Sequence, residues 1–382
     1  MAVQRHTRGL PGDPLQQLLE APRPRLRLHQ DRGWADAGLS FSAEAGLADL
    51  PREGTLVVPS APPWENVGDS ISFGLTTTIP TKRSDPPEER LRAVEDTLAG
   101  LPPADFTVYT DGSASGGVEF GGGGAVVYRG EQELQKIRVP AGRHTSSYRA
   151  ELMALDAALE YLQRAARDAP RAEVRLCTDS QSALRRLARG PAARSDMLAD
   201  RVWARLRALA DGGLRLRLQW VPGHAGLPGN ELADEVARAA AELDQGAVPV
   251  DLCSAKSKLR RRAFDEWEER LRPTRYWTEN GPRRVTPGER LGLTRRESVE
   301  MARLRTGHST LLAVHNHRIG TAHVATCPEC GESDESLHHL LADCPARAAV
   351  RRAVFGRDDP TTREALEDLR RLVDLLVRLG RL

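Results

Sequence analysis

The chain of 382 residues is longer than a single hydrophobic core usually fills, so two domains with connecting segments are expected. Its 55 basic and 53 acidic residues nearly cancel, and the net charge of +2 therefore points to no particular partner. Five cysteines are too few for a disulfide scaffold, the start has no apolar signal region, and no apolar run approaches membrane-spanning length. These features favour a soluble protein of a reducing intracellular compartment and argue against a membrane partner.

Residues 1–104 are interrupted by proline-rich pieces such as APRPRLRLHQ and PSAPPWENVGDS, and they lack the sustained periodicity of a compact domain. Prolines also bracket a short helix that is expected from Glu88 to Leu98. The segment is therefore predicted to be an extended arm that ends in a linker.

Residues 105–245 show denser and more regular patterns. Glycine-rich or charged turns separate three strand-like runs, which predict an antiparallel meander: Phe106–Thr110, Gly123–Tyr128 and Leu134–Val139. A long helix follows in SSYRAELMALDAALEYLQRA, with Ser146 or Ser147 as its N-cap. The remaining elements are a strand in AEVRLCTDS, helices in SALRRLARG and, capped by Ser195, SDMLADRVWARLRALA, a strand in LRLRLQWV and a helix in GNELADEVARAAAEL. This order predicts an α/β fold, a mixed sheet with helices packed on it.

Residues 246–382 are predicted to be mostly helical. Arginine-dense runs with nearby tryptophans lie between Lys256 and Arg296, and this pattern predicts contact with nucleic acid. The run TREALEDLRRLVDLLVRLG predicts a terminal amphipathic helix whose leucines pack on a neighbouring element rather than on a membrane.

Four carboxylates are expected at strand ends or helix starts of the predicted sheet. Asp111 ends the run FTVYTD, Glu151 lies in the first turn of the long helix, Asp179 ends EVRLCTD, and Asp234 lies one turn into the last helix. Asp111 taken alone reads more simply as a residue that bonds the backbone of the following glycine turn. Strand ends and helix starts of one sheet share a rim, however, so the four side chains are expected to meet there.

Such a cluster needs cations. Two unit charges ~4 Å apart at an effective dielectric of ~20 repel by about 4 kcal/mol. Oxygen ligands select hard ions, which makes Mg²⁺ or Mn²⁺ the expected cofactor. Two such ions about 3.5–4 Å apart form a clamp for phosphodiester hydrolysis, and nuclease chemistry is therefore predicted.

Four stretches carry a family resemblance over residues Asp105 to Leu243. YTDGSASGG, SSYRAELMAL, LCTDSQSAL and WVPGHAGLPGNELAD resemble, in order, the four signature blocks of the type 1 ribonuclease H family. The resemblance implies a ribonuclease H-like fold, with a five-stranded mixed sheet, and endonucleolytic cutting of the RNA strand of an RNA/DNA hybrid. It also implies that the metal ligands are Asp111, Glu151, Asp179 and Asp234. In the family, a histidine placed like His224, here in a glycine loop, helps proton transfer and product release.

Four residues are candidates for contacts with the substrate. Gly112 and Ser113 would bring the backbone close to the RNA minor groove, where 2′-hydroxyls distinguish RNA from DNA. Gln181 and Asn230 are candidates for polar contacts to sugar or phosphate, although capping and turn bonding explain such residues as well.

A cysteine-rich stretch, CPECGESDESLHHLLADC, places Cys327, Cys330, His339 and Cys344 at the spacing C-x2-C-x8-H-x4-C. This spacing predicts a tetrahedral, structural Zn²⁺ site, with His338 as the alternative to His339. The stretch resembles the zinc motif at the C-terminus of non-long-terminal-repeat retrotransposon polyproteins.

The order of arm, nuclease, basic helices and zinc motif resembles the C-terminal part of an ingi-like retrotransposon protein. That resemblance implies nuclear residence and a reverse transcriptase of the same element as a partner. The chain itself is not expected to polymerise, because the adjacent Asp358 and Asp359 lack the apolar hairpin of a polymerase. It is expected to be an element fragment or a separate gene, and the alternative function is a nucleic-acid-binding module with little or no nuclease activity.

Overall fold

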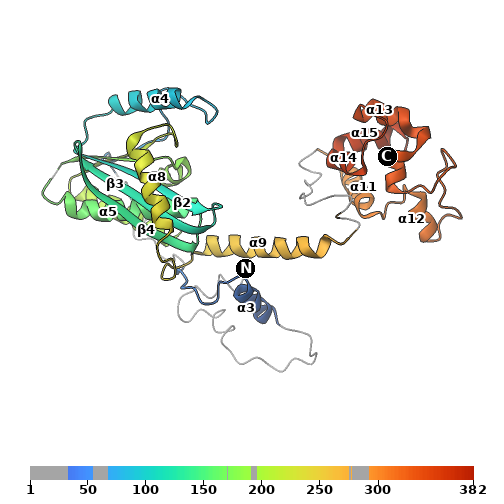
Figure 1. Ribbon diagram of the computed structural model, residues 1–382, viewed down its shortest axis with the longest axis horizontal. Helices are drawn as coiled ribbons and strands as arrows, with labels where there is room; N and C mark the ends of the chain where they lie inside the picture. The colour runs from blue at the N-terminus through green and yellow to red at the C-terminus, as the bar shows by residue number, and fades with distance from the viewer. Residues whose placement is uncertain (1–32, 55–67, 170, 191–195, 275–276, 278–291) are drawn as a thin grey trace. The chain divides into compact units, whose positions relative to one another are not determined.

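The computed structural model of the protein describes residues 33–54, 68–169, 171–190, 196–274, 277 and 292–382 (Figure 1). The chain divides into two compact units, Met1–Arg262 and Ala263–Leu382. Within the described ranges, no helix is both long and apolar enough to cross a lipid bilayer.

A mixed sheet of six strands forms the centre of the first unit, in the order β1-β6-β5-β2-β3-β4 (Figure 1). The strands are β1 (Ile71–Gly74), β2 (Phe106–Ser115), β3 (Glu119–Arg129), β4 (Gln132–His144), β5 (Glu173–Thr178) and β6 (Arg215–Trp220). The antiparallel meander of β2, β3 and β4 is confirmed, and β5, β6 and β1 extend the sheet in parallel. The predicted number of five strands is wrong, because β1 comes from the segment that was expected to be an arm.

Helices cover both faces of this sheet (Figure 1). They are α4 (Pro87–Ala99), α5 (Ser147–Ala165), α6 (Gln181–Leu187), α7 (Met197–Asp211) and α8 (Pro228–Ala241). Adjacent residues of a strand point to opposite faces. Accordingly, Val127 of β3 joins the core beneath α5 and α7, while Val126 packs against Val236 of α8. The predicted α/β layering is therefore confirmed.

The structure shows which residues cap the N-termini of two predicted helices. Ser146 is the N-cap of α5, because its Oγ accepts a hydrogen bond from the backbone N–H of Arg149 at 3.2 Å. Asp196 caps α7 through a 2.8 Å bond from the N–H of Ala199. The predicted cap Ser195 lies outside the described residues.

Glycines in β3 let the helices approach the sheet closely. A Cβ at Gly124 would collide with the backbone of Ala237 in α8, and a Cβ at Gly123 would lie 2.8 Å from the backbone nitrogen of Ala154 in α5. Any larger residue would push one helix away from the strand, and the rim that carries the acidic residues would open.

The described parts of residues 1–104 do not form an extended arm. Helix α3 (Trp34–Glu44) joins a small core with Val250, and β1 is part of the sheet. Helix α4 confirms the helix that was predicted from Glu88 to Leu98. Residues 1–32 and 55–67 lie outside the described ranges.

The second unit is helical, as predicted. Helix α9 (Leu252–Leu271) contains the boundary between the units, and the later elements are α11 (Arg295–Thr306), α12 (Ala313–Arg318), a π-helical turn (His339–Asp343), a 3₁₀ turn (Pro345–Arg347), α13 (Ala348–Phe355), α14 (Thr362–Glu367) and α15 (Leu369–Arg378). The predicted single terminal helix is two helices, because Asp368 leaves the helical conformation and caps α15. The leucines of α15 pack in the core of this unit, which confirms their predicted role.

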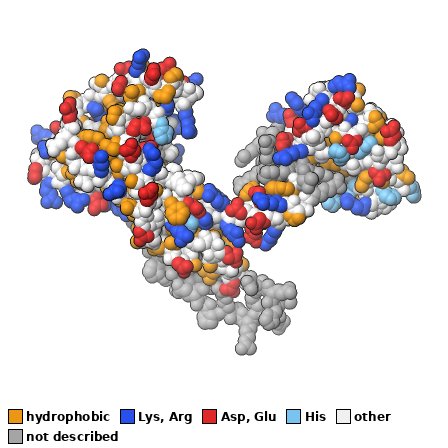
Figure 2. All heavy atoms as spheres, viewed as in Figure 1, with side chains coloured by type: hydrophobic (Ala, Val, Ile, Leu, Met, Phe, Trp, Pro, Cys, Tyr) orange, Lys and Arg blue, Asp and Glu red, His pale blue; other side chains and the backbone are white. Residues whose placement is uncertain are grey.

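Basic and acidic side chains are intermixed over the face of the molecule seen in Figure 2. In α9, Arg270 of the predicted basic run pairs with Glu266 of the same helix. Lys258 is held by Glu119 of β3. Residues 278–291 of the predicted nucleic-acid-binding run lie outside the described ranges, and its described part is a helix of mixed charge.

Candidate active site

Three carboxylates meet where the parallel pairing of β2 and β5 ends. The last residue pair of the two strands is Thr110 with Thr178, and Asp111 and Asp179 are the residues that follow this pair. Strand β2 continues beside β3 as far as Ser115, and Asp111 therefore lies within the strand rather than at its end as predicted. One oxygen of each of Asp111, Glu151 and Asp179 lies within 4.8 Å of the other two.

Glu151 reaches this cluster from α5. It lies just beyond the first turn rather than in it, because the helix begins at Ser147. A Cβ at Gly112 would collide with the backbone of Glu151, so the glycine is what lets helix and strand touch here. The N–H of Gly112 also donates to Oδ1 of Asp111 at 2.6 Å. Gly112 thus has a structural role in addition to the contact with substrate that the sequence predicts.

Burial makes the three carboxylates hard to ionise together. Burial, and then the negative charge of Asp179, raises the pKa of Asp111 to about 7. Burial raises the pKa of Glu151 well above its usual value, and the charges of both aspartates add to this. Burial also raises the pKa of Asp179, against the opposing effects of a hydrogen bond with Glu151 and of the nearby His224. A divalent cation would relieve this repulsion, and carboxylate oxygens are the ligands that Mg²⁺ and Mn²⁺ prefer.

The fourth predicted carboxylate lies beside the cluster. Asp234 forms an ion pair with Arg238, one turn further along α8, at 2.7 Å. One carboxylate oxygen of Asp234 and one ligand atom of each of His224 and Glu231 lie within 4.8 Å of one another. Its charge still raises the pKa of Asp111 and of Asp179, so the two groups are electrostatic neighbours. The prediction that four carboxylates meet holds in this structure for three.

His224 lies in the loop between β6 and α8, with an exposed side chain. Its φ of 51° is in the left-handed region, which non-glycine residues seldom adopt. Arg90 of α4 holds the loop, donating from Nη1 to the carbonyl of Gly223 at 2.9 Å and from Nη2 to that of His224 at 3.2 Å. The glycine loop is therefore anchored from a helix that lies 134 residues earlier in the chain.

The remaining substrate candidates differ in their placement. Ser113 is half-buried on β2. Gln181 donates from Nε2 to the carbonyl of Leu75 at 2.9 Å. Asn230 is only 2% exposed within α8, which does not fit a contact with substrate.

Sequence reasoning missed four residues of the site. The hydroxyl of Thr178 donates to Oε2 of Glu151 at 3.2 Å, and Nε1 of Trp220 donates to the carbonyl of Asp179 at 3.0 Å. Thr178 and Trp220 stand inside the signature blocks, and Glu231 lies on the same helical face as Asp234, so the sequence carried a signal for these three. Arg90 had none, because its partners are backbone carbonyls.

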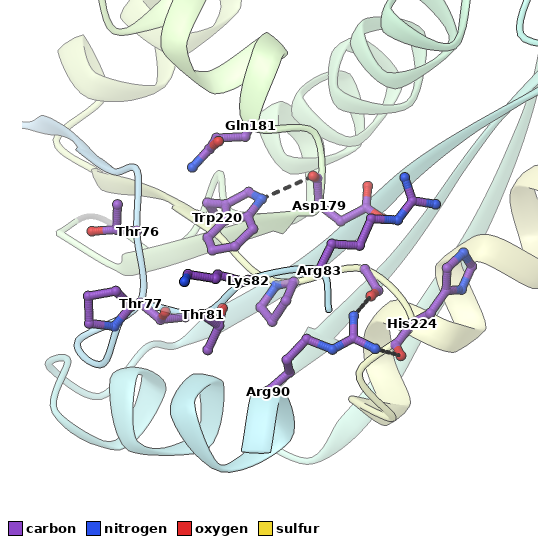
Figure 3. A pocket seen from close by; sticks show the side chains of 13 residues that line it. Thr76, Thr77, Thr81, Lys82, Arg83, Arg90, Asp179, Gln181, Trp220 and His224 are labelled. Carbon is purple, nitrogen blue, oxygen red and sulfur yellow. Dashed lines mark hydrogen bonds between the residues drawn. The ribbon is translucent and has the colours of Figure 1, made fainter. Parts of the chain in front are cut away.

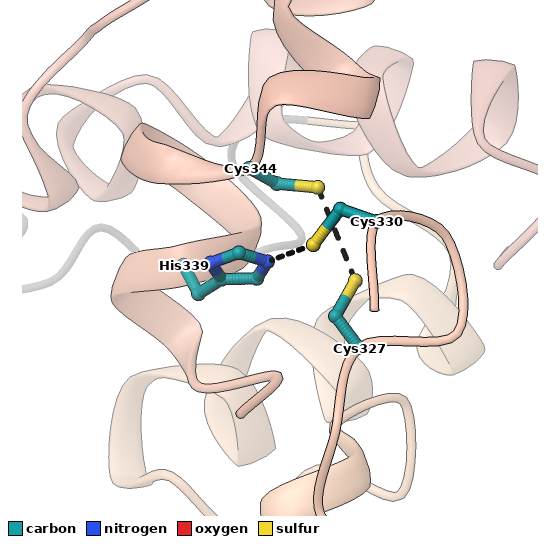
Figure 4. A group of neighbouring side chains, drawn as sticks. All are labelled: Cys327, Cys330, His339 and Cys344. Carbon is teal, nitrogen blue, oxygen red and sulfur yellow. Dashed lines mark hydrogen bonds between the residues drawn. The ribbon is translucent and has the colours of Figure 1, made fainter. Parts of the chain in front are cut away.

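A second cluster lies in the helical unit (Figure 4). Its members are Cys327, Cys330, His339 and Cys344, whose ligand atoms lie within 4.8 Å of one another. Sγ of Cys327 lies 3.9 Å from Sγ of Cys344. Two sulfurs in a tetrahedron with Zn–S bonds of about 2.3 Å lie about 3.8 Å apart, so the spacing fits a zinc site.

The surroundings of the cysteine cluster shift the pKa values of its thiols in opposite directions. The backbone N–H of Glu332 lowers the pKa of the Cys330 thiol, and burial raises the pKa of Cys344 to about 11. His338 instead lies 2.8 Å from the hydroxyl of Thr362 through Nδ1. Of the two predicted alternatives, His339 is therefore the one that joins the cysteines.

The strand order and the acidic rim together define a ribonuclease H-like α/β protein. A model of the RNase H family matches residues 103–242. A ribonuclease H of Bradyrhizobium diazoefficiens is 37% identical over 142 residues, which cover 35% of this chain and 86% of the relative. A ribonuclease H of Escherichia coli is 38% identical over 146 residues, or 35% of this chain and 87% of the relative. The chain belongs to the ribonuclease H family.

One of the similar solved structures is the N-terminal RNase H domain of a Mycobacterium tuberculosis protein, fused to maltose-binding protein. The identity is 23% and the TM-score 0.29, and the match covers 41% of this chain and 99% of that one. Strand β1, helices α3 and α4 and the cysteine cluster lie outside the residues that the family model matches.

Proposed function

We propose that the protein is a metal-dependent endonuclease that hydrolyses the RNA strand of RNA/DNA hybrids. The observation that carries the proposal is the buried cluster of Asp111, Glu151 and Asp179 within the residues matched by the RNase H family. Relatives named ribonuclease H, at 37–38% identity, support the same reaction.

The cluster is proposed to hold two ions of Mg²⁺ or Mn²⁺, with Asp234 as a fourth ligand once it turns from Arg238. The all-oxygen donor set and the repulsion among its members support this assignment. Divalent ions bound there would act as Lewis acids that stabilise the negative charge developing on the phosphodiester.

The protein's own groups have two tasks in this reaction. Water attacks phosphorus and one P–O bond breaks, so a proton must leave the water and another must reach the leaving oxygen. The exposed His224 is proposed to carry protons at a ring nitrogen, close to Asp179 and Asp234. Thr178 keeps the carboxylate of Glu151 in place, and Arg90 keeps the backbone of His224 in place.

Cys327, Cys330, His339 and Cys344 are proposed to bind one structural zinc ion. Four protein ligands close a tetrahedral site, which leaves no position for a reacting water. The ion would therefore stabilise the helical unit and take no part in hydrolysis. Derivation from an ingi-like retrotransposon, with nuclear residence, a reverse transcriptase partner and nucleic-acid contacts of the basic segment, remains a prediction from the order of motifs.

Purified full-length protein with a labelled RNA/DNA hybrid and Mg²⁺ or Mn²⁺ tests the enzyme proposal. Cleavage of the RNA strand is expected with wild type and not with Asp179→Asn, and matched single-stranded RNA and double-stranded DNA should stay intact. If wild type cleaves no more than Asp179→Asn, while both bind the hybrid, the chain acts as a nucleic-acid-binding module instead.

A further inference from the structure

Residues 68–83 precede the family match, and Ile71–Gly74 among them form a strand of the nuclease sheet. Strand β1 pairs with β6 from Ile71 opposite Leu216 to Gly74 opposite Gln219. A Cβ at Gly74 would collide with the side chain of Gln219, so the glycine permits this pairing. The Nε2 of Gln219 then donates to the carbonyl of Thr76 at 3.1 Å. The chain that leaves β1 is therefore fixed on the rim that carries Asp179.

Helix α4 fastens the other end of the same segment. Val94 packs with Cys177, Val221 and Leu227 in a small apolar cluster. The hydroxyl of Thr97 accepts a hydrogen bond from the N–H of Thr78 at 2.9 Å. The residues between β1 and α4 thus form a wall that is anchored on both sides.

This wall and the active-site rim border an open cavity of about 610 Å³ (Figure 3). Thr81, Lys82 and Arg83 line it from the wall. Asp179, Trp220 and His224 line it from the nuclease. Figure 3 shows Lys82 near the Trp220 ring, and Arg83 extending toward Asp179. A substrate bound at the carboxylate cluster would lie beside this cavity, because Asp179 belongs to both.

Charge indicates what the cavity accepts. Lys82 and Arg83 are exposed, and neither forms an ion pair with an acidic side chain among the described residues. Arg149 of the same unit, by contrast, is paired with Glu53 at 2.9 Å. Two adjacent cations that remain available suit the oxygens of phosphodiesters, and the Trp220 ring offers a flat apolar surface beside them.

We propose that Lys82 and Arg83 bind adjacent backbone phosphates of the nucleic-acid substrate, so that residues 76–83 form a substrate-binding wall beside the ribonuclease H site. This inference rests on the proposed function. The wall adds contacts to substrate outside the residues that the family model matches. It holds the nucleic-acid strand against the side of the active site that Asp179 and His224 form.

Binding of a fluorescent RNA/DNA hybrid tests the proposal in full-length protein. The Asp111→Asn background, with Mg²⁺ present, prevents cleavage without a chelator that would also strip zinc. Lys82→Ala/Arg83→Ala should weaken binding about tenfold and reduce the slope of log K against log salt by about 1.5, because each phosphate contact contributes about 0.7–0.9. Arg164→Ala/Arg167→Ala is the matched control, since Arg164 lies about 20 Å from Glu151 along α5 and both arginines are exposed.

Cleavage kinetics of the same pairs in the wild-type background complete the test. Lys82→Ala/Arg83→Ala should raise KM about tenfold and leave kcat within about twofold, because the wall binds the strand away from the reacting bond. Equal affinity and salt slope in the wall variant and the control pair would overturn the inference, whether or not wild type cleaves. Absence of cleavage by wild type, with the expected loss of binding in the wall variant, would instead overturn the proposed nuclease and retain the wall.

Discussion

The cysteine cluster and the carboxylate cluster of this protein offer a metal ion chemically different ligands. In each, the ligand atoms lie within 4.8 Å of one another. The cysteine cluster comes from 18 consecutive residues, Cys327 to Cys344, whereas Asp111 and Asp179 lie 68 residues apart and are joined through a sheet. One donor set is sulfur and nitrogen, and the other is oxygen alone.

The comparison teaches that proximity of ligands does not decide what a cluster does. Cys327 and Cys344 are at most 1% exposed, and a fourfold donor set would close the site around a soft ion. Asp179 instead lines a cavity of about 610 Å³, so a substrate can reach the carboxylates. We therefore expect that a substitution in one site impairs that site and leaves the other one intact.

The largest effect is expected from the carboxylate cluster. Asp111→Asn should lower kcat/KM for a hybrid by about 10³-fold or more, because the proposed divalent ions would lose an anionic ligand. Its zinc content should equal that of wild type. Asp211→Asn, an exposed carboxylate at the end of α7, is the control and should be fully active. Substantial activity in Asp111→Asn would remove this residue from the site.

The second prediction concerns a substitution in the cysteine cluster. Cys330→Ser should lose about one zinc ion per chain and make the helical unit sensitive to protease, since structural zinc contributes directly to folding. Cleavage of a short hybrid should stay within about threefold of wild type, because no step of hydrolysis uses this site. Metal analysis and limited proteolysis measure the first effect, and Cys253→Ser, an exposed thiol on α9, controls for loss of a cysteine. Retained zinc would contradict the assignment.

A smaller effect is expected where α4 supports the active-site loop. His224→Ala should lower kcat by about 10²-fold, a typical contribution of general acid–base catalysis. Arg90→Ala should lower it by about three- to tenfold, because the loop loses two hydrogen bonds that fix the backbone of His224. Arg92→Ala, exposed on the same helix, should have no effect. In the His224→Ala background, Arg90→Ala should change kcat little, and fully additive effects would show that Arg90 acts elsewhere.

The smallest effect concerns stability and pH. The pKa of Asp111 rises from its usual 3.8 to about 7 on folding, so its contribution to stability is present below about pH 4 and is lost as the pH rises through 7. Without divalent ions, the melting temperature of the nuclease transition should fall across this range, and Asp111→Asn should flatten the decline by a few degrees. Mg²⁺ at pH 8 should raise the melting temperature of wild type more than that of the variant. Equal pH profiles of the two proteins without metal would contradict the pKa shift.

Local patterns in the sequence were enough to predict much of this molecule. The alternation in β2 and β3, the leucine spacing of α5 and the signature blocks predicted the ribonuclease H-like sheet and its acidic residues. The C-x2-C-x8-H-x4-C spacing identified the cysteine cluster, because all four ligands lie within one short segment. Such features depend on neighbours in sequence, and a single stretch of chain contains them.

Only the tertiary structure decided the features that depend on contacts between distant segments. Strand β1 has four residues and no distinctive pattern, and it becomes a strand because β6 offers it an edge. Arg90 supports His224 through backbone carbonyls, which leave no mark in the sequence. In each case, the partner that determines the role of a residue is chosen by packing.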